Sequence, residues 1–303
     1  MRLLSFLRDG KASYGCVTES GVIDLARIFN SEAPDLKALI ANNLVNVAAT
    51  HGARHKPSLA LKDLQLLPVI PNPGKIICVG LNYEEHVRET KREVTRNPTL
   101  FLRVNESQVA HGQVIVLPAE TVQLDYEGEI AVIVGKPGRR IAQADAWGHV
   151  VGYACYNDGS VRDWQAAANQ WTAGKNFWRT GAFGPWMVTA DEIPPGQTMT
   201  LVTRLNGKKM QRATTDMMIH SIPQLISHIS TFTPLRSGDV IVTGTPGGIG
   251  SRRNPPVFMG SGDVVEVEVN KIGILRNVVA CEISDIEDRF YVEAKPRSVG
   301  RSG

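Results

Sequence analysis

Two glutamates with the spacing of a metal site, Glu127 and Glu129, lie one residue apart in the run LDYEGEIAVIVG. The apolar, β-branched residues 130–134 that follow predict a buried strand. Because residues i and i+2 of a strand point to the same face, the two carboxylates would repel each other and lose hydration. A hard divalent cation, which prefers oxygen ligands, would relieve both effects. Glu-Gly-Glu before a strand is also typical of a solvated turn, so spacing alone leaves both interpretations open.

A third acid, Asp158, ends a second apolar run, VVGYACYND, so three acids are expected at strand ends. The segment continues through Arg162, Asp163 and Gln165. Gln165 offers a donor and an acceptor, which suits a carbonyl or a carboxylate. Asp163 could pair with Arg162 in a purely structural role.

An imidazole and a carboxylate share one face of a helix predicted after the strand KIICVG. Asn82 is placed to cap this helix, and His86 and Glu89 are three residues apart on it. Such a pair can deprotonate a water molecule, although a surface His–Glu pair is the commoner arrangement. Four basic residues follow on or after this helix: Arg88, Lys91, Arg92 and Arg96. They indicate either a solvated helix face or a mobile, positively charged flap that attracts an anion.

Two further segments could contact an anionic ligand. Lys175, in TAGKNFWRTG, could bring positive charge to a developing enolate, or it could be a lysine that packs its stem and extends its amine to solvent. In IVTGTPGGIG, Gly244, Thr245 and Gly247 could present N–H groups and a hydroxyl to an anion. The run is neither a dinucleotide fingerprint nor a P-loop, so it gives little support to nucleotide binding.

These residues need a scaffold, which the sequence predicts to be mainly β. Residues 1–70 resemble a small α/β unit with two short strands and a stretch of helical periodicity, and LLPVIPNPGK marks a boundary. Residues 71–293 are rich in short β-branched runs, which predict a mainly antiparallel β core with few helices. The basic residues 294–303 are expected to form a flexible tail.

Composition limits the class of protein. The 303 residues carry a formal net charge of +3, too small an excess to indicate nucleic-acid binding. No apolar run is long enough to span a membrane. The four cysteines are scattered without a CxxC pair. We therefore expect a cytoplasmic protein with no membrane or nucleic-acid partner.

Taken in order, these motifs resemble the fumarylacetoacetate hydrolase family. The similarity extends over more than two thirds of the chain, through CVGLNYEEH, PTLFLR, LDYEGEIAVIVG, GYACYNDGSVRDWQ, GKNF, GPWMVT, NGKKMQ and GDVIVTGTPGGIG. The resemblance implies an α+β, mainly β fold: a mixed β-roll catalytic core with a small N-terminal domain, usually in a homodimer.

The resemblance also implies a role for each matching residue. Mg²⁺ or Mn²⁺, or Ca²⁺ as in some relatives, would be bound by Glu127, Glu129 and Asp158. His86 and Glu89 would activate water on a flap, and Lys175 would stabilise an enolate. The substrate, a small anionic 2-oxo acid, would be bound by Tyr83, Arg103, Arg162, Gln165, Gly244 and Thr245.

The sequence departs from the family pattern at two places. Arg103 stands where a lysine is common, and a rigid guanidinium replaces a point charge there. After Lys175, Asn176, Trp178 and Arg179 replace residues that are small or acidic in relatives, which indicates a larger, flatter or more anionic substrate.

We expect from these features a metal-dependent hydrolase that cleaves a carbon–carbon bond in an acylpyruvate or fumarylpyruvate, as in aromatic catabolism. The same site could instead decarboxylate an oxaloacetate-like acid or catalyse keto–enol isomerisation. A metal-dependent nuclease is a remote alternative. It would need a basic groove with interleaved aromatics, which a chain with a net charge of +3 and 6% aromatic residues does not obviously supply. A binding protein without activity is disfavoured because all five catalytic and metal-ligand residues are present.

Overall fold

The structure is a computed structural model, and it describes residues 1–282. The expected flexible tail, and the last residues of the expected catalytic domain, lie outside the described part. No helix among the described residues is long and apolar enough to cross a membrane.

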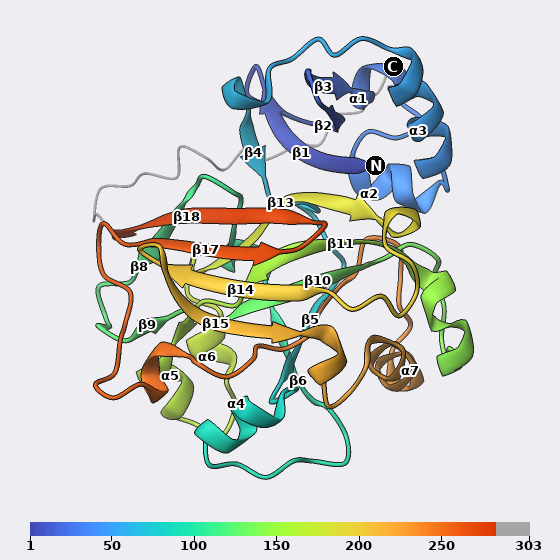
Figure 1. Cartoon of the computed structure of the whole chain (residues 1–303). Coiled ribbons are helices and arrows are strands. Elements are labelled where there is room, and N and C mark those ends of the chain that lie inside the picture. The colour runs from blue at the N-terminus through green and yellow to red at the C-terminus, as the bar shows by residue number, and fades with distance from the viewer. Residues whose placement is uncertain (283–303) are drawn as a thin grey trace, which may run out of the picture.

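Two large sheets and one small one dominate the fold (Figure 1). In the described residues the largest sheet has eleven strands. Nine of them form one continuous path, in the spatial order β3 (Gly21–Asp24), β2 (Lys11–Thr18), β1 (Arg2–Arg8), β13 (Gly181–Thr189), β11 (Val150–Asn157), β10 (Gly128–Val134), β16 (Val240–Val242), β5 (Ile76–Gly80) and β6 (Thr99–Arg103). Off this path, β4 (Gln65–Leu67) pairs with β1, and β7 (Gln108–Val109) pairs with β13.

The second sheet packs against the middle of the first. Its order is β15 (Lys208–Thr214), β14 (Thr200–Leu205), β17 (Val264–Val269), β18 (Gly273–Cys281) and β8 (Val114–Leu117). A two-stranded ribbon is formed by β9 (Leu124–Asp125) and β12 (Ser160–Val161). The α-helices are α1 (Leu25–Phe29), α2 (Leu36–Ala41), α3 (Val45–Arg54), α4 (Glu84–Glu89), α5 (Arg162–Ala166), α6 (Thr172–Lys175) and α7 (Ile222–Phe232). The 3₁₀ turns span Leu61–Asp63, Asn105–Ser107, Gln143–His149, Ala190–Glu192, Thr215–Met217 and Gly250–Arg252.

Strand β10 is buried on both faces, which explains its unbroken apolar sequence. Ile130 and Val132 belong to the core between the two large sheets. Ala131 and Ile133 belong to a second core, shared with the N-terminal helices. By contrast, β14 and β17 alternate buried and half-buried residues, because only one of their faces is covered.

The N-terminal region is a small β/α unit, as the sequence predicts. Its strand β1 extends the main sheet by pairing with β13, through Arg2 opposite Val188 and Leu3 opposite Met187. The expected boundary near residue 70 stays a prediction. The whole described fold is mixed α+β with mostly β content, which confirms the predicted class.

Strand direction brings the candidate residues to one end of the main sheet. The start of β10 lies beside the end of β11, with Glu129 opposite Tyr156. Strand β16 is antiparallel to β10 and parallel to β5, so the ends of β16 and β5 reach the same edge. Segments distant in sequence therefore meet at this edge.

Candidate metal centre and substrate pocket

Three carboxylates converge at this end of the sheet. Glu127 directly precedes β10, Glu129 is its second residue, and Asp158 directly follows β11. One oxygen from each lies within 4.8 Å of the others, and all three side chains are buried. A short ladder contact, in which the Asp158 N–H donates to the Glu127 carbonyl at 2.8 Å, fixes the two segments relative to each other. The predicted convergence of the three acids is thus confirmed.

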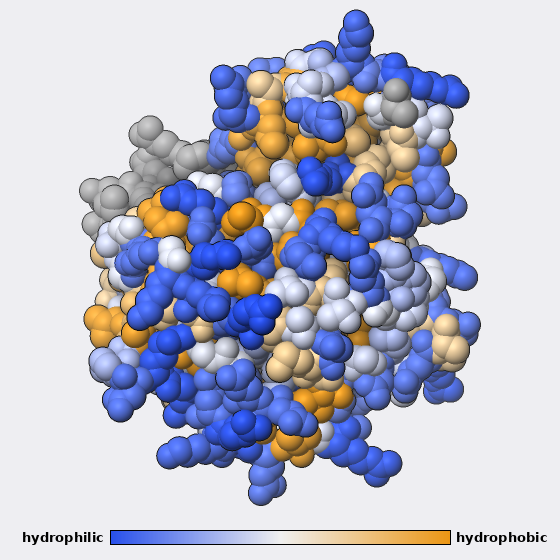
Figure 2. All heavy atoms as spheres, viewed as in Figure 1, coloured by the Kyte–Doolittle hydropathy of each residue, from blue (hydrophilic) through white to orange (hydrophobic). Residues whose placement is uncertain are grey.

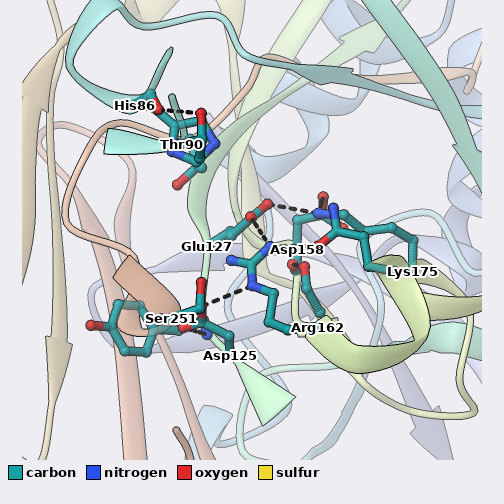
Figure 3. Close-up of polar contacts among 12 residues, drawn as sticks. His86, Thr90, Asp125, Glu127, Asp158, Arg162, Lys175 and Ser251 are labelled. Carbon is teal, nitrogen blue, oxygen red and sulfur yellow. Dashed lines mark hydrogen bonds and ion pairs between the residues drawn. The ribbon is translucent and has the colours of Figure 1, made fainter. Parts of the chain in front are cut away.

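Two of the carboxylates are paired with buried cations (Figure 3). Lys175 Nζ lies 2.7 Å from Glu127 Oε2 and 2.7 Å from Asp158 Oδ2. Arg162 Nη1 lies 2.7 Å from Glu127 Oε1, and Arg103 Nη1 contacts Asp158. Burial opposes ionisation of Glu127, but the charges of Arg162 and Lys175 hold its pKa well below the usual range. The pKa of Lys175 is raised, since Asp158 and Glu127 outweigh its burial.

The third carboxylate, Glu129, has no cationic partner within the described residues. In the described structure the backbone N–H of Gly244 donates a hydrogen bond to its Oε2. Burial and the neighbouring charges of Asp158 and Glu127 raise its pKa well above the usual value. A buried carboxylate without a counter-charge is unfavourable unless a proton or a cation neutralises it.

These donors fit a hard divalent cation. All three are carboxylate oxygens, which Mg²⁺ and Mn²⁺ accept. With every group ionised, the buried centre carries one excess negative charge: Asp125, Glu127, Glu129 and Asp158 against Arg103, Arg162 and Lys175. Glu127, Glu129 and Asp158 would hold the ion, which would supply Lewis-acid stabilisation of an enolate oxygen.

The predicted His86–Glu89 pair is formed on α4. His86 Nδ1 lies 2.8 Å from Glu89 Oε1, and the N–H of Gly248 donates to Glu89 Oε2 at 2.8 Å. A carboxylate acceptor at Nδ1 orients the imidazole and leaves Nε2 able to accept a proton. Because Glu89 uses one oxygen for His86 and the other for the glycine-rich loop, it links the helix to that loop.

A cavity of about 440 Å³ opens onto this centre. The predicted functional residues that line it are His86, Glu127, Glu129, Arg162, Gln165, Lys175 and Thr245. Arg162 Nη2 is buried and lacks a hydrogen-bond partner in the described structure. Since Arg162 borders the cavity, this unused donor is suited to a substrate carboxylate.

Three other predicted residues, Tyr83, Arg103 and Gly244, do not line the cavity, and Thr245 lines it but uses its hydroxyl within the protein. Tyr83 is buried and bridges to Met218, and Arg103 is buried against Asp158. Gly244 donates its N–H to Glu129. The Thr245 hydroxyl donates to the Gly128 carbonyl at 3.0 Å and accepts from Gln211 at 2.8 Å. Direct substrate contact by these four residues stays a prediction.

Two local expectations are wrong. Asn82 does not cap α4, because its amide donates to the carbonyls of His220 and Thr243 instead. Arg162 pairs with Asp125 and Glu127 rather than with Asp163. Asp163 instead accepts from the Thr121 hydroxyl at 2.8 Å.

One important residue, Asp125, was missed by sequence reasoning. It is fully buried and accepts hydrogen bonds from Arg162 Nε and from the N–H groups of Gly250 and Ser251. It therefore positions both a pocket arginine and the loop that borders the cavity. The available signal was its place two residues before Glu127 in the same run of acids.

Similarity to known proteins decides the family. The profile described as "Fumarylacetoacetate (FAA) hydrolase C-terminal" matches residues 75–280. The chain belongs to the fumarylacetoacetate hydrolase family. Oxaloacetate tautomerase FAHD2A, mitochondrial, from Bos taurus is 36% identical over 291 residues, covering 92% of this chain and 91% of that protein. Oxaloacetate tautomerase fahd2, mitochondrial, from Xenopus laevis is 40% identical over 223 residues, covering 73% and 70%.

Solved structures of family members have the same fold. A putative HpcE protein from Mycobacterium smegmatis superimposes with a TM-score of 0.84 at 30% identity, covering 93% of this chain and all of that one. Maleylpyruvate hydrolase from Sphingobium sp. SYK-6, in complex with manganese(II) and pyruvate, gives a TM-score of 0.78 at 28% identity, with coverages of 93% and 100%. This family member is therefore an enzyme with an acidic metal site.

Proposed function

We propose that this enzyme catalyses the keto–enol tautomerisation of a dicarboxylic 2-oxo acid of the oxaloacetate type, with Mg²⁺ or Mn²⁺ at the three carboxylates. The observation that carries the proposal is the similarity, over 92% of the chain, to a protein named oxaloacetate tautomerase. The site supports it, because tautomerisation needs a proton carrier and a cationic environment for an enolate, and both line one cavity.

Each residue has a definable task in this reaction. Arg162 would bind the 2-oxo acid carboxylate end-on through Nη2, since its Nε and Nη1 are occupied by protein acceptors. His86 Nε2 would remove the proton from carbon 3 and return it to the carbonyl oxygen, so that the atoms balance without a leaving group. Glu89 would hold the imidazole in the required tautomer. Lys175, buried and charged, would stabilise the negative charge on the enolate oxygen.

Hydrolytic cleavage of an acylpyruvate or fumarylpyruvate is the second candidate. The His86–Glu89 pair could equally deprotonate a water molecule, and a structurally similar relative is named maleylpyruvate hydrolase. Decarboxylation needs the enolate stabiliser without an attacking water. The three reactions differ in their products, which makes them separable in one assay.

The test is a product-resolved assay with added Mg²⁺ or Mn²⁺. Oxaloacetate and an acylpyruvate are each followed by enol absorbance, by released pyruvate and by carbon dioxide. Tautomerisation predicts metal-dependent loss of enol absorbance without pyruvate or carbon dioxide. Cleavage of the acylpyruvate with no acceleration of oxaloacetate enol decay would instead establish the hydrolase, and rapid carbon dioxide release would establish a decarboxylase.

A further inference from the structure

Two arginines at the rim of the pocket, Arg92 and Arg252, have no carboxylate partner in the described structure. Both line the cavity and both are exposed. The other basic residues of the lining, Arg162 and Lys175, are paired with buried carboxylates. The positive charge at the rim is therefore available to an anion from outside the protein.

Only one member of the basic group after His86 reaches the cavity. Arg88, Lys91 and Arg96 are exposed but do not border it, whereas Arg92 does. Hydrophilic side chains project from the lower end of the molecule, where α4 and the loop after it lie (Figure 2). The remaining basic residues of this group thus belong to a solvated surface, and Arg92 is distinguished by its position.

Aromatic packing holds Arg92 at the rim. Its guanidinium carbon lies 5.4 Å from the ring centroid of Trp171, a cation–π distance. Trp171 packs edge-on against Phe101 at 5.5 Å, and Lys175 Nζ lies 4.9 Å from the Phe101 centroid. Gly80 makes room for the indole, since a Cβ there would lie 2.4 Å from it. One wall of the cavity thus runs from the buried lysine along two aromatic rings to an exposed arginine.

With a metal ion bound, the charges at the bottom of the pocket can neutralise one substrate carboxylate but not a second. The buried centre carries one excess negative charge when its groups are ionised. A divalent cation reverses this to one positive charge, which balances a single substrate carboxylate. A second carboxylate needs further cations, and the unpaired ones that line the cavity are Arg92 and Arg252.

The cavity is large enough for a ligand with one end at the metal centre and the other at the rim. Its volume of about 440 Å³ falls within the range of ~300–1,000 Å³ that holds drug-sized ligands. A four-carbon acid would leave much of it to water. Phe101 and Trp171 offer an apolar surface to a carbon chain between the two ends.

We propose that Arg92 and Arg252 form a distal carboxylate subsite. The substrate would be a 2-oxo dicarboxylate whose carbon chain lies along Phe101 and Trp171 and whose far carboxylate reaches the rim. This inference deepens the proposed function and depends on it, because the 2-oxo acid end must bind at the metal centre.

Binding of a matched pair of probes tests the subsite. Calorimetry with Mn²⁺ present compares 2-oxoheptanedioate with 2-oxoheptanoate, which share the chelating end and differ only in the far carboxylate. We expect the wild type to bind the dicarboxylate about tenfold more tightly, as two partly exposed charge pairs allow. Arg92→Gln and Arg252→Gln should each reduce this ratio, and the double variant should bring it close to one, without changing affinity for 2-oxoheptanoate.

A matched control separates local contact from general charge. Arg139→Gln removes an exposed arginine that does not line the pocket, and it should preserve the ratio. Equal binding of both probes to the wild type, or an unchanged ratio in the double variant, would overturn the subsite and leave the proposed function intact. If neither probe binds but oxaloacetate binds in a metal-dependent way, the subsite fails and the proposed function stands; if oxaloacetate does not bind either, both fail.

Discussion

Replacing Glu129 by glutamine should stabilise the metal-free protein and abolish its response to metal. The amide keeps the shape of the side chain and an oxygen that can accept the Gly244 N–H. It removes the one carboxylate of the three that has no cationic partner in the described structure. Stability and metal binding should therefore change in opposite directions.

The size of the effect follows from burial. An unneutralised buried charged group costs about 1–3 kcal/mol or more, and the pKa of Glu129 is raised by burial and then by the charges of Asp158 and Glu127. An acid with a raised pKa in the folded state lowers stability as the pH rises above its unfolded value of about 4.3. The advantage of Glu129→Gln should thus be present at neutral pH and vanish below about pH 4.

Thermal unfolding with and without Mn²⁺ measures both effects. For a chain of this size, about 1 kcal/mol corresponds to about 2 °C, so the metal-free variant should melt about 2–6 °C above the metal-free wild type. Metal at about a thousand times its Kd should add about 4 kcal/mol to the wild type alone. Glu19→Gln, on an exposed turn, is the control. A less stable metal-free variant, or one that keeps the full metal response, would refute the reasoning.

Three other changes have distinct expected outcomes. His86→Gln should lower turnover by about 10²–10⁴-fold, the usual contribution of a positioned acid–base group, while calorimetry finds Mn²⁺ affinity unchanged; a large loss of metal would contradict its assignment. Lys175→Met leaves Glu127 and Asp158 without a shared cation, so denaturant unfolding of the metal-free protein should show a loss of about 3–5 kcal/mol; unchanged stability would exclude this role. Asp125→Asn should raise the substrate KM and lower stability by about 3 kcal/mol, because Arg162 loses a charged partner; an unchanged KM would show that Arg162 needs no such support.

Local pattern predicted that the three acids lie at strand ends, whereas the metal itself was implied by the family resemblance. Glu127 and Glu129 precede an apolar run, and Asp158 follows another. The antiparallel pairing of β10 and β11 then brings these ends together without any further information. The His86–Glu89 pair was predictable for the same reason, since helical spacing alone places the two side chains on one face.

Such local patterns could not predict which residues distant in the sequence would become partners. Arg162 has an acid next to it in sequence, yet it pairs with Asp125 and Glu127, which precede it by more than thirty residues. Asn82 has the residue type of a helix cap, but the carbonyls of two distant segments compete for its amide. In both cases the choice is made by tertiary contacts, which a local propensity does not contain.

The bridging position of Glu89 links the orientation of the His86 imidazole to the packing of α4 against the glycine-rich loop. Movement of α4 away from the glycine-rich loop would break the contact with the Gly248 N–H. Glu89 would then be free to rotate, and the imidazole of His86 would lose the fixed tautomer that this carboxylate imposes. In the proposed reaction, proton transfer by His86 would therefore depend on the contact between α4 and this loop.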